Sequence, residues 1–434
     1  MDNSLFGIVA AQKSGKALGI YSACSANPFV LEAVLSRGKR DDSIVLIEST
    51  ANQCDQFGGY TGMTPPDFRN KVLETAKKVG FDPGMLYLGG DHLGPLTFAD
   101  RDEEEAMKLA EDLIRAYVEA GFTKIHIDTS MRLGSDDVDA PLSNETIARR
   151  GARLARAAEE SFRKLQEKDP GAIRPVYIVG SEVPIPGGST DNSDKLAVTG
   201  VDDFNSTVRT FEKVFAEEGL QEAYRNVMAF VVQPGVEEKD SGCVEYDRAK
   251  AADLMAEIKK YPNIVFEGHS TDYQTKYKLR EMVEDGVGIL KVGPGLTFAL
   301  REGLYALSFI EDELVKEGSR SCFREVLDEA MQENPKYWKK HYHGTDEEIA
   351  FRRRYSFSDR CRYYYANGKV EESIEKLFGN LKGRIPWNLL SQFMPVQYDR
   401  VREGLLENDP EALVIDRIGD TIDQYMFATR QQKL

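Results

Sequence analysis

Short apolar runs alternate with amphipathic segments along the first two thirds of the chain. Eight of these runs are almost continuously apolar, which is typical of parallel strands buried on both faces. They cover residues 17–24, 43–50, 86–92, 124–130, 175–183, 226–234, 263–270 and 287–294. Helical periodicity marks the intervening segments 67–79, 101–120, 145–168, 201–219, 246–260 and 271–285. This alternation predicts an α/β fold, the (β/α)8 TIM barrel.

An open, doubly wound sheet is the competing fold, and it would place a glycine-rich dinucleotide loop after an early strand. The G-x-G-x-x-G pattern of such a loop is absent from the sequence. Beyond residue 296 the pattern becomes helical, over 298–316, 321–333, 347–365 and 370–381, and a tail follows. We therefore predict a barrel over residues 1–296 and a helical C-terminal extension over 297–434 that packs on it.

Each predicted strand ends in a polar or ionisable side chain. In order along the chain, these are Cys24 with Ser25, Glu48, Asp91 with His92, Asp128, Glu182, Gln233, His269 with Ser270, and Lys291. The carboxyl ends of the strands carry the active site in TIM barrels. Eight polar ends at one rim therefore predict a catalytic cleft rather than ordinary loop starts.

Two of the five histidines, His92 and His269, follow predicted strands 3 and 7. With Glu182 and Gln233 they form a mixed nitrogen and oxygen set that could hold a divalent metal ion, either Zn²⁺, Mn²⁺, Co²⁺ or Mg²⁺. The alternative is that each histidine is a hydrogen-bonded structural residue. His126 lies in mid-strand, and we expect it to be a barrel-interior residue. The alternative is that it holds a metal ligand in position through a hydrogen bond.

Carboxylates crowd the same predicted rim. They are Glu48, Asp91, Asp128 and Glu182, of which Asp91, Asp128 and Glu182 are the candidate acid/base residues. A ring of like charges is costly without a cation, so this ring favours a metal ion or raised pKa values. Ion pairs to Lys124 or Lys291 are the alternative. Adjacent strand residues face opposite ways, so Asp91 and His92 can both point inward only where the strand has ended.

Two regions are candidates for binding substrate or phosphate. Loops 7 and 8 of TIM barrels often hold phosphate through backbone N–H groups, and here they contain Ser270, Lys291, Gly293 and Gly295. Glu48 and Gln53 belong to the second predicted strand and its loop, and residues 56–64 and 183–189 are candidate substrate loops. A basic, aromatic cluster in the extension offers Arg353 and Arg360, although a packing and ion-pair face would explain it equally well.

Composition narrows the classes of function. The chain has 434 residues and a formal net charge of −16, which argues against a nucleic-acid surface. No apolar run is long enough to span a membrane, and no basic leader precedes the short apolar patch near the N-terminus. The 5 cysteines are irregularly spaced, as in reduced intracellular proteins. We therefore expect a cytoplasmic protein.

Several motifs together resemble one known family, the one named for the accessory subunit of bacterial tagatose-1,6-bisphosphate aldolase. They include SACSANP, LGGDHLGP, KIHIDTSM, VVQPGVE, HSTDYQT and LKVGP, in this order from Ser22 to Pro294. YSFSDRCRYYY and LLSQFMP in the extension also match, so the resemblance covers nearly the whole chain. It implies a TIM barrel related to the metal-dependent, class II aldolases.

The resemblance also bears on individual residues. Asp91 and His92 resemble the Asp-His pair that supplies an acid/base and a metal ligand in class II aldolases, and His269 resembles a later ligand. The usual middle histidine has no clear counterpart, so Gln233 or Glu182 would replace it.

Three functions are compatible with the resemblance. The first is a metal-dependent C4 epimerase that interconverts tagatose 6-phosphate and fructose 6-phosphate. The second is a non-catalytic accessory subunit of a class II aldolase complex, and the third is an epimerase of another ketose or of a ketohexuronate. The expected partners are a phosphorylated ketohexose and, for the second function, an aldolase chain; a homo-oligomer is a further option.

Overall fold

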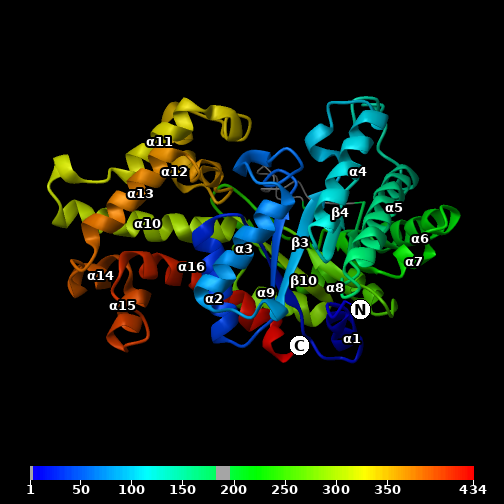
Figure 1. Ribbon diagram of the computed structural model, residues 1–434, viewed down its shortest axis with the longest axis horizontal. Coiled ribbons are helices and arrows are strands. Elements are labelled where there is room, and N and C mark those ends of the chain that lie inside the picture. Colours follow the sequence, from blue (N-terminus) through cyan, green and yellow to red (C-terminus); the bar gives the residue numbers. More distant parts are fainter. Residues whose placement is uncertain (1–2, 182–195) are drawn as a thin grey trace.

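The computed structural model describes residues 3–181 and 196–434. Its core is a closed barrel of parallel strands in the order β1-β10-β9-β6-β5-β4-β3-β2 (Figure 1). The strands are β1 (Ile20–Cys24), β2 (Val45–Thr50), β3 (Leu86–Leu93), β4 (Lys124–Ile127), β5 (Val176–Val179), β6 (Val227–Val232), β9 (Val265–Gly268) and β10 (Val287–Val292). Every predicted strand is present, so the predicted TIM barrel is confirmed.

Helices cover the outside of the barrel. They are α2 (Pro28–Arg40), α3 (Pro65–Val79), α4 (Glu103–Glu119), α5 (Asn144–Lys168), α6 (Val201–Glu217), α7 (Gln221–Tyr224), α8 (Arg248–Ile258) and α9 (Lys276–Asp285). The sequence analysis did not predict α2, although its start is well marked. Asn27 caps it by accepting the backbone N–H of Phe29 at 3.0 Å, and Pro28 occupies the first turn, where proline is favoured.

The last barrel helix comes from the far end of the chain. Helix α10 (Pro294–Leu314) starts directly after β10 but runs away from the barrel into the C-terminal extension (Figure 1). Helix α16 (Pro410–Thr429) returns and packs against α2, α9, α10 and β1. It therefore closes the ring of helices between α9 and α2. We predicted only a tail beyond residue 381, and this prediction is wrong. Leu413, Ile418 and Ile422 give α16 a buried apolar face.

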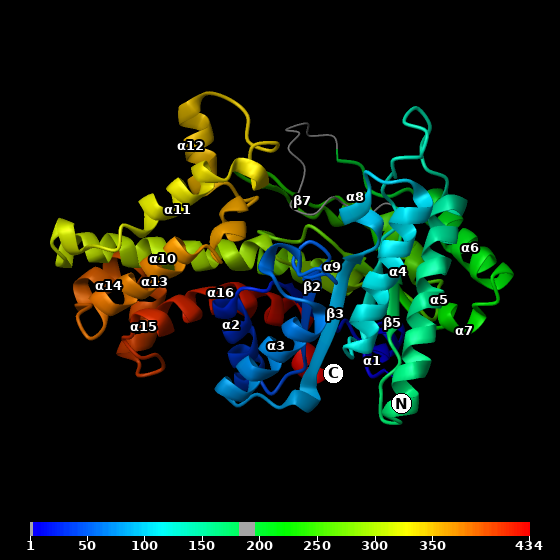
Figure 2. The same cartoon turned by 45° about the horizontal axis from the view of Figure 1, so that its top comes forward.

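The remaining helices of the extension gather on one side of the barrel (Figure 2). They are α11 (Phe323–Glu333), α12 (Asp346–Tyr355), α13 (Gly368–Leu381), α14 (Trp387–Phe393) and α15 (Pro395–Arg402). The helix predicted over 347–365 is interrupted, because α12 ends at Tyr355 and a separate 3-10 turn covers Arg360–Tyr364. The predicted boundary between the barrel and the extension, after residue 296, falls within α10. The division of the chain into these two parts stays a prediction.

The lower half of the barrel interior is an apolar plug. Leu46 on β2, Val265 on β9 and Ile289 on β10 pack there with Leu5 and Ile8, the latter from the N-terminal helix α1 (Phe6–Lys13). Helix α1 thus closes the end of the barrel where the strands begin. The opposite end, where the strands end, holds the charged residues described below.

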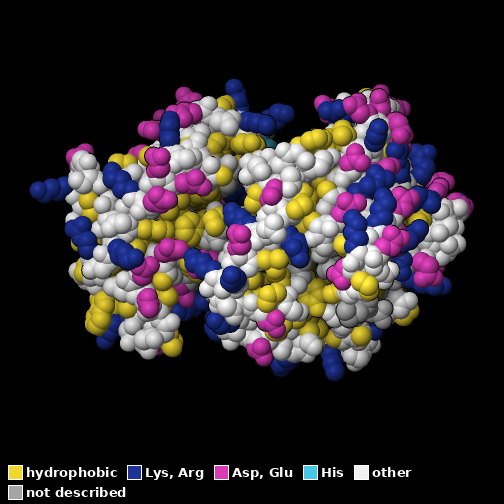
Figure 3. Space-filling model, in the orientation of Figure 1, with side chains coloured by type: hydrophobic (Ala, Val, Ile, Leu, Met, Phe, Trp, Pro, Cys, Tyr) yellow, Lys and Arg dark blue, Asp and Glu magenta, His cyan; other side chains and the backbone are white. Residues whose placement is uncertain are grey.

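Charges of both signs are interspersed on the surface over α4 and α5 (Figure 3). Ion pairs join the two helices, including Arg153 Nη1 to Glu104 Oε2 at 2.8 Å. Among the described helices, none is long and apolar enough to cross a membrane.

Candidate active site

The alternation of strand residues builds a charged layer on top of the apolar plug. Side chains two residues apart face the same side of a strand, so Glu48 follows Leu46 into the barrel and Glu267 follows Val265. On β4, Lys124 and His126 share one face in the same way. All four of these polar side chains are fully buried. Gly89 on β3 leaves the room that Glu48 needs, because a Cβ there would lie 2.7 Å from Glu48 Cγ.

Two lysines neutralise part of this layer. Lys124 Nζ lies 2.6 Å from Glu48 Oε1 and 2.7 Å from Glu267 Oε2. Lys291 Nζ is 2.8 Å from Asp91 Oδ1 and also pairs with Glu48. The ion pairs considered as an alternative are therefore present. Burial alone would raise the pKa of Asp91, but Lys291 and His92 hold this pKa well below its ordinary value.

Asp91 and His92 both face the site because β3 bulges between them. The pairing of β3 with β4 shifts register between Gly90 and Leu93, and His92 has a φ of 49°. A left-handed backbone is unusual for a residue other than glycine and clusters at functional sites. Both side chains line the same cavity, which strict alternation along β3 would prevent.

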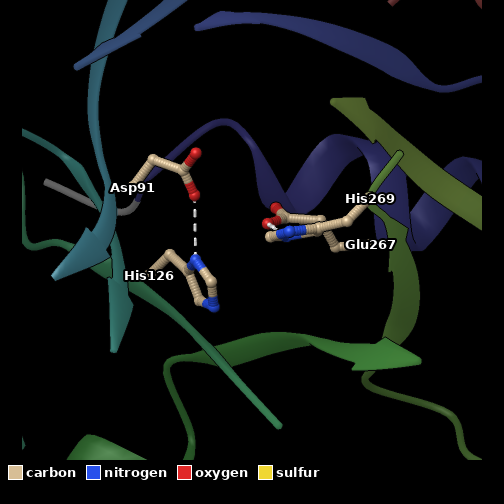
Figure 4. A group of neighbouring side chains, drawn as sticks. All are labelled: Asp91, His126, Glu267 and His269. Carbon is tan, nitrogen blue, oxygen red and sulfur yellow. Dashed lines mark hydrogen bonds and ion pairs between the residues drawn. The ribbon is translucent and has the colours of Figure 1, made fainter. Parts of the chain in front are cut away.

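Three imidazole rings form a triangle at the top of the barrel. The ring centroids of His92, His126 and His269 are each 5.0 Å from the other two. Each ring also meets a different carboxylate, and the three contacts are His92 Nδ1 to Asp128 Oδ2 at 2.8 Å, His126 Nδ1 to Asp91 Oδ1 at 2.9 Å and His269 Nε2 to Glu267 Oε1 at 2.9 Å. This arrangement fixes the orientation of each ring. In Figure 4, Asp91 and His126 approach from one side and Glu267 and His269 from the other.

Acidic side chains outnumber lysines around the triangle. Burial lowers the pKa of His269 to about 3, so this ring is uncharged at neutral pH. Four carboxylates then face only two lysines, and the groups are Glu48, Asp91, Asp128, Glu267, Lys124 and Lys291. Burial alone would lower the pKa of His92, but Asp91 and Asp128 raise it above its ordinary value. The excess of carboxylates over lysines favours a cation at this site.

The cluster also has the donor atoms that a cation needs. Ligand atoms of Asp91, His126, Glu267 and His269 all lie within 4.8 Å of one another, and all four residues are buried. His126 Nε2 is buried, and no hydrogen-bond partner reaches it from the described residues. Buried polar atoms are rarely left without a partner. The residues therefore fit a bound metal ion with mixed nitrogen and oxygen ligands.

A cavity of about 90 Å³ lies above the cluster. Asp91, His92, His269 and Lys291 form its floor, while Gln53 and Tyr60 from the loop after β2 also line it. Two carboxylates add to its wall, Glu238 from the short strand β7 (Glu237–Glu238) and Asp272 from the loop after β9. Burial, with Asp272 nearby, raises the pKa of Glu238 to about 8. Glu238 is therefore mainly protonated at neutral pH and could donate a proton.

The C-terminal extension completes this cavity. Arg362 and Tyr363, in the 3-10 turn Arg360–Tyr364, both line it. The ring of Tyr363 packs against Tyr60 of the barrel loop with centroids 4.8 Å apart. The extension is thus part of the site rather than a separate appendage.

Comparison with known proteins now places the chain. Residues 5–430 match the model of the D-tagatose-1,6-bisphosphate aldolase subunit GatZ/KbaZ-like family. The chain belongs to this family. A crystal structure described as a probable tagatose 6 phosphate kinase from Sinorhizobium meliloti 1021 is 42% identical over 95% of this chain and 100% of that one, with a TM-score of 0.86.

Two aldolase structures are more distant. The YdjI aldolase from Escherichia coli K12 is 12% identical over 88% of this chain and 98% of that one, with a TM-score of 0.42. The fructose-bisphosphate aldolase from Campylobacter jejuni is 14% identical over 86% of this chain and 91% of that one, with a TM-score of 0.43.

In this GatZ/KbaZ-like chain, many of the predicted site residues come together. Asp91, His92, His269, Gln53, Ser270, Lys291 and Gly293 line the cavity. Glu48 lies beneath it in the ion-pair layer, and Asp128 reaches the site through His92. Glu182 and the predicted loop 183–189 lie outside the described residues.

Other predicted residues have different partners in the structure. Gln233 Oε1 accepts the backbone N–H groups of Gly235 at 2.8 Å and Val236 at 3.0 Å, so its side chain closes a turn rather than facing the cluster. The N–H groups of Gly293 and Gly295 donate to Asp272 Oδ1 at 3.1 and 2.7 Å. Asp272 thus occupies the position predicted for a phosphate.

The two arginines proposed for phosphate binding also point elsewhere. Arg353 pairs with Asp328, Nε to Oδ1 at 2.7 Å, and Arg360 donates to the carbonyl oxygen of Tyr337 at 3.1 Å. For these two residues the packing and ion-pair alternative holds, and neither lines the cavity.

Sequence reasoning missed several residues of the site, notably Glu238, Glu267 and Asp272. Glu267 lies two residues before His269, so the period of a strand would have placed it on the same face. Glu238 carried no such signal, because a hairpin brings it to the cavity. Arg362 belongs to the basic, aromatic cluster of the extension that also contains Arg353 and Arg360.

Proposed function

We propose that this chain is a metal-dependent C4 epimerase that interconverts D-tagatose 6-phosphate and D-fructose 6-phosphate. The observation that carries the proposal is the cluster of histidines and carboxylates at the floor of a cavity with several charged side chains in its lining. The family description, which names a tagatose bisphosphate aldolase subunit, supports a ketose phosphate as the substrate class.

The proposed metal site uses residues that the barrel already holds in place. His126 and His269 would supply nitrogen and Glu267 oxygen, with His92 at the edge of the group and Asp91 left as a base. When bound, the ion supplies a Lewis acid that polarises the C2 carbonyl of the ketose. His92 and His269 were expected ligands, whereas the expected ligand Gln233 is engaged in its turn.

Chemistry at C4 of a 2-ketose requires more than proton abstraction from carbon. The hydrogen on C4 is not α to the C2 carbonyl, so deprotonation there gives no stabilised anion. Cleavage of the C3–C4 bond, followed by rotation of the aldehyde fragment and re-addition, inverts C4. One group must accept the proton of the 4-hydroxyl during cleavage and return it on re-addition.

Asp91 is the best-placed base for this proton. Its carboxylate lines the cavity, and Lys291 keeps it ionised by holding its pKa low. Asp128 has a positioning role, because it bonds His92 Nδ1 at 2.8 Å and the Ser130 hydroxyl at 2.7 Å and does not line the cavity. Glu238, protonated at neutral pH, is a second group that could hold a proton for the fragments.

Retention of both fragments separates an epimerase from an aldolase. The cavity is small, at about 90 Å³, and Arg362 and Tyr363 from the extension form part of its wall. A small site favours re-addition over release, since a confined fragment meets its partner at high effective concentration.

The experiment supplies the chelator-treated full chain with Zn²⁺, Mn²⁺, Co²⁺ or Mg²⁺ in turn and follows tagatose 6-phosphate by NMR. We expect fructose 6-phosphate with at least one metal, and loss of this activity in His126→Gln, His269→Ala and Asp91→Asn. His343→Gln is the matched control, because His343 is exposed and outside the cluster. Absence of turnover with every metal would contradict the proposal, and free triose products would indicate an aldolase.

An accessory subunit is the second candidate function, since the family description names an aldolase subunit. Under that function, mixing the chain with a class II aldolase chain would raise the activity or half-life of the aldolase, while the chain alone would be inactive. Activity on another ketose or on a ketohexuronate is tested by the same NMR assay with a panel of sugars.

A further inference from the structure

Arg362 occupies an unusual position among the arginines of the extension. It lines the cavity above the histidine cluster and also an adjoining cavity of about 580 Å³. His92, His269 and Asp91 line only the first of these cavities. Arg362 therefore lies where the two cavities meet, together with Cys24, Gln53, Tyr60 and Gly293.

Neighbouring groups fix the Arg362 side chain without neutralising it. Its Nη1 donates to the carbonyl oxygens of Ser358 and, at 3.0 Å, Asp359, and its Nη2 donates to the Tyr363 hydroxyl at 3.1 Å. The guanidinium also packs on the ring of Tyr363 at 4.5 Å. A guanidinium has five N–H groups, so two of them have no partner among the described residues.

Other arginines nearby are already paired. Arg301 meets Asp359 at 3.3 Å and Arg353 meets Asp328 at 2.7 Å. Within the described residues, no carboxylate lies within 4 Å of the Arg362 guanidinium. Arg362 is partly buried, and a bound anion would stabilise a partly buried cation that has no ion-pair partner.

The other charged groups of the cavity form no ion pair with Arg362 within the described residues, although the charge of Arg362 lowers the pKa values of Asp272 and Glu238. Lys291 is committed to Glu48 and Asp91, so it is not free to bind a substrate anion. Asp272 accepts the N–H groups of Gly293 and Gly295. Glu238 lies on the same wall, and burial with Asp272 raises its pKa to about 8, which leaves it largely uncharged at pH 7.

We propose that Arg362 binds the oxyanion at the C6 end of the sugar substrate, through its two unpartnered N–H groups. Arginine suits this role because its planar fork matches the oxygens of a phosphate or a carboxylate. The histidine cluster and Arg362 then hold opposite ends of the ketose, with the C3–C4 bond between them. The inference rests on the proposed function for the identity of the sugar, but binding can be measured without turnover.

The test measures binding of tagatose 6-phosphate, inorganic phosphate, a ketohexuronate and uncharged tagatose to the full chain by calorimetry. We expect Arg362→Gln to weaken binding of the anionic ligand at least 10-fold and to leave tagatose unchanged. Arg362→Lys keeps the charge but not the fork, so it should recover only part of the loss. Arg354→Gln is the matched control, because Arg354 is exposed in the same lobe.

The same variant shows whether Arg362 binds a phosphate or a carboxylate. Weaker binding of tagatose 6-phosphate in Arg362→Gln indicates a phosphate site, and weaker binding of the ketohexuronate indicates a carboxylate site. Equal affinity of wild type and Arg362→Gln for every anionic ligand would overturn the inference, as would an equal loss for uncharged tagatose. If Arg362→Gln unfolds at a lower temperature than Arg354→Gln, its weaker binding could come from lost stability. The affinity of Arg362→Lys for the anionic ligands then decides whether Arg362 binds them.

This test separates the inference from the proposed function. An inactive wild type that binds a sugar phosphate through Arg362 would contradict only the epimerase. An active wild type whose KM is unaffected by Arg362→Gln would contradict only the role of Arg362.

Discussion

Nδ1 of His92 lies 2.8 Å from Oδ2 of Asp128, and both side chains are buried at the end of the barrel. Asp128 thereby fixes the orientation of a histidine that has a left-handed backbone and lines the reaction cavity. Burial alone would raise the pKa of Asp128, but His92 lowers it to about 2. The carboxylate is therefore ionised at neutral pH and holds the Nδ1 proton of the ring.

Asp128→Asn should lower kcat while the chain stays folded. An amide of the same shape cannot hold the Nδ1–H tautomer of His92 as a carboxylate does, and loss of such supporting partners costs about 10–100-fold in metal affinity or activity. The NMR assay for tagatose 6-phosphate measures the effect. Ser130→Ala removes a single hydrogen bond to Asp128 and should change kcat much less; an equal effect of both variants would argue against the orienting role.

Lys124→Met should destabilise the protein strongly. Lys124 is fully buried between Glu48 and Glu267, and removal of one partner from a buried ion pair typically costs about 3–5 kcal/mol. Unfolding in urea measures the difference. Lys250→Met is the control, since the Lys250 side chain is 76% exposed, and its effect should stay within about 0.5 kcal/mol. If Lys124→Met lowered the free energy of unfolding no more than Lys250→Met does, other groups would have to neutralise Glu48 and Glu267.

Glu238→Gln should stabilise the protein increasingly as the pH rises. Burial, together with Asp272, raises the pKa of Glu238 to about 8 in the folded state, whereas the unfolded chain loses this proton near pH 4.3. The folded state binds more protons in between, so this group lowers stability as the pH rises from about 4.3 to about 8. Glutamine does not titrate.

Urea unfolding of wild type and Glu238→Gln at pH 5, 6.5 and 8 checks this dependence. Two neighbours act on the pKa of Glu238 in opposite directions: Asp272 raises it and Arg362 lowers it. Burial also raises the pKa of Asp272, to about 6. A difference between the two proteins that is constant across the three pH values would rule out a protonated Glu238.

The sequence was sufficient for the barrel because its signals are local. Apolar runs, their spacing and the polar residues at their ends identified every strand, and Asp91, His92, His269 and Lys291 were predicted to lie at the rim. The bulge at His92 could not be predicted, since it depends on how β3 pairs with β4. Helix α16 was also missed, because its role as the last barrel helix follows from packing against α2 and α9.

The cavity wall was harder to predict for a related reason. Arg353 and Arg360 had the right chemistry, but Asp328 and the Tyr337 carbonyl engage them, and Arg362 in the same cluster faces the cavity instead. Which arginine of a basic cluster points inward depends on the backbone of a short 3-10 turn. Likewise, Gly293 and Gly295 had the pattern of a phosphate loop, yet Asp272 occupies their N–H groups.

The most direct test of the epimerase proposal is the reaction of tagatose 6-phosphate with the metal-supplied chain in D₂O, followed by NMR. Cleavage and re-formation of the C3–C4 bond never breaks the C4–H bond, so we predict fructose 6-phosphate that keeps protium at C4. Deuterium at C4, or no fructose 6-phosphate with any of the four metals, would contradict the account.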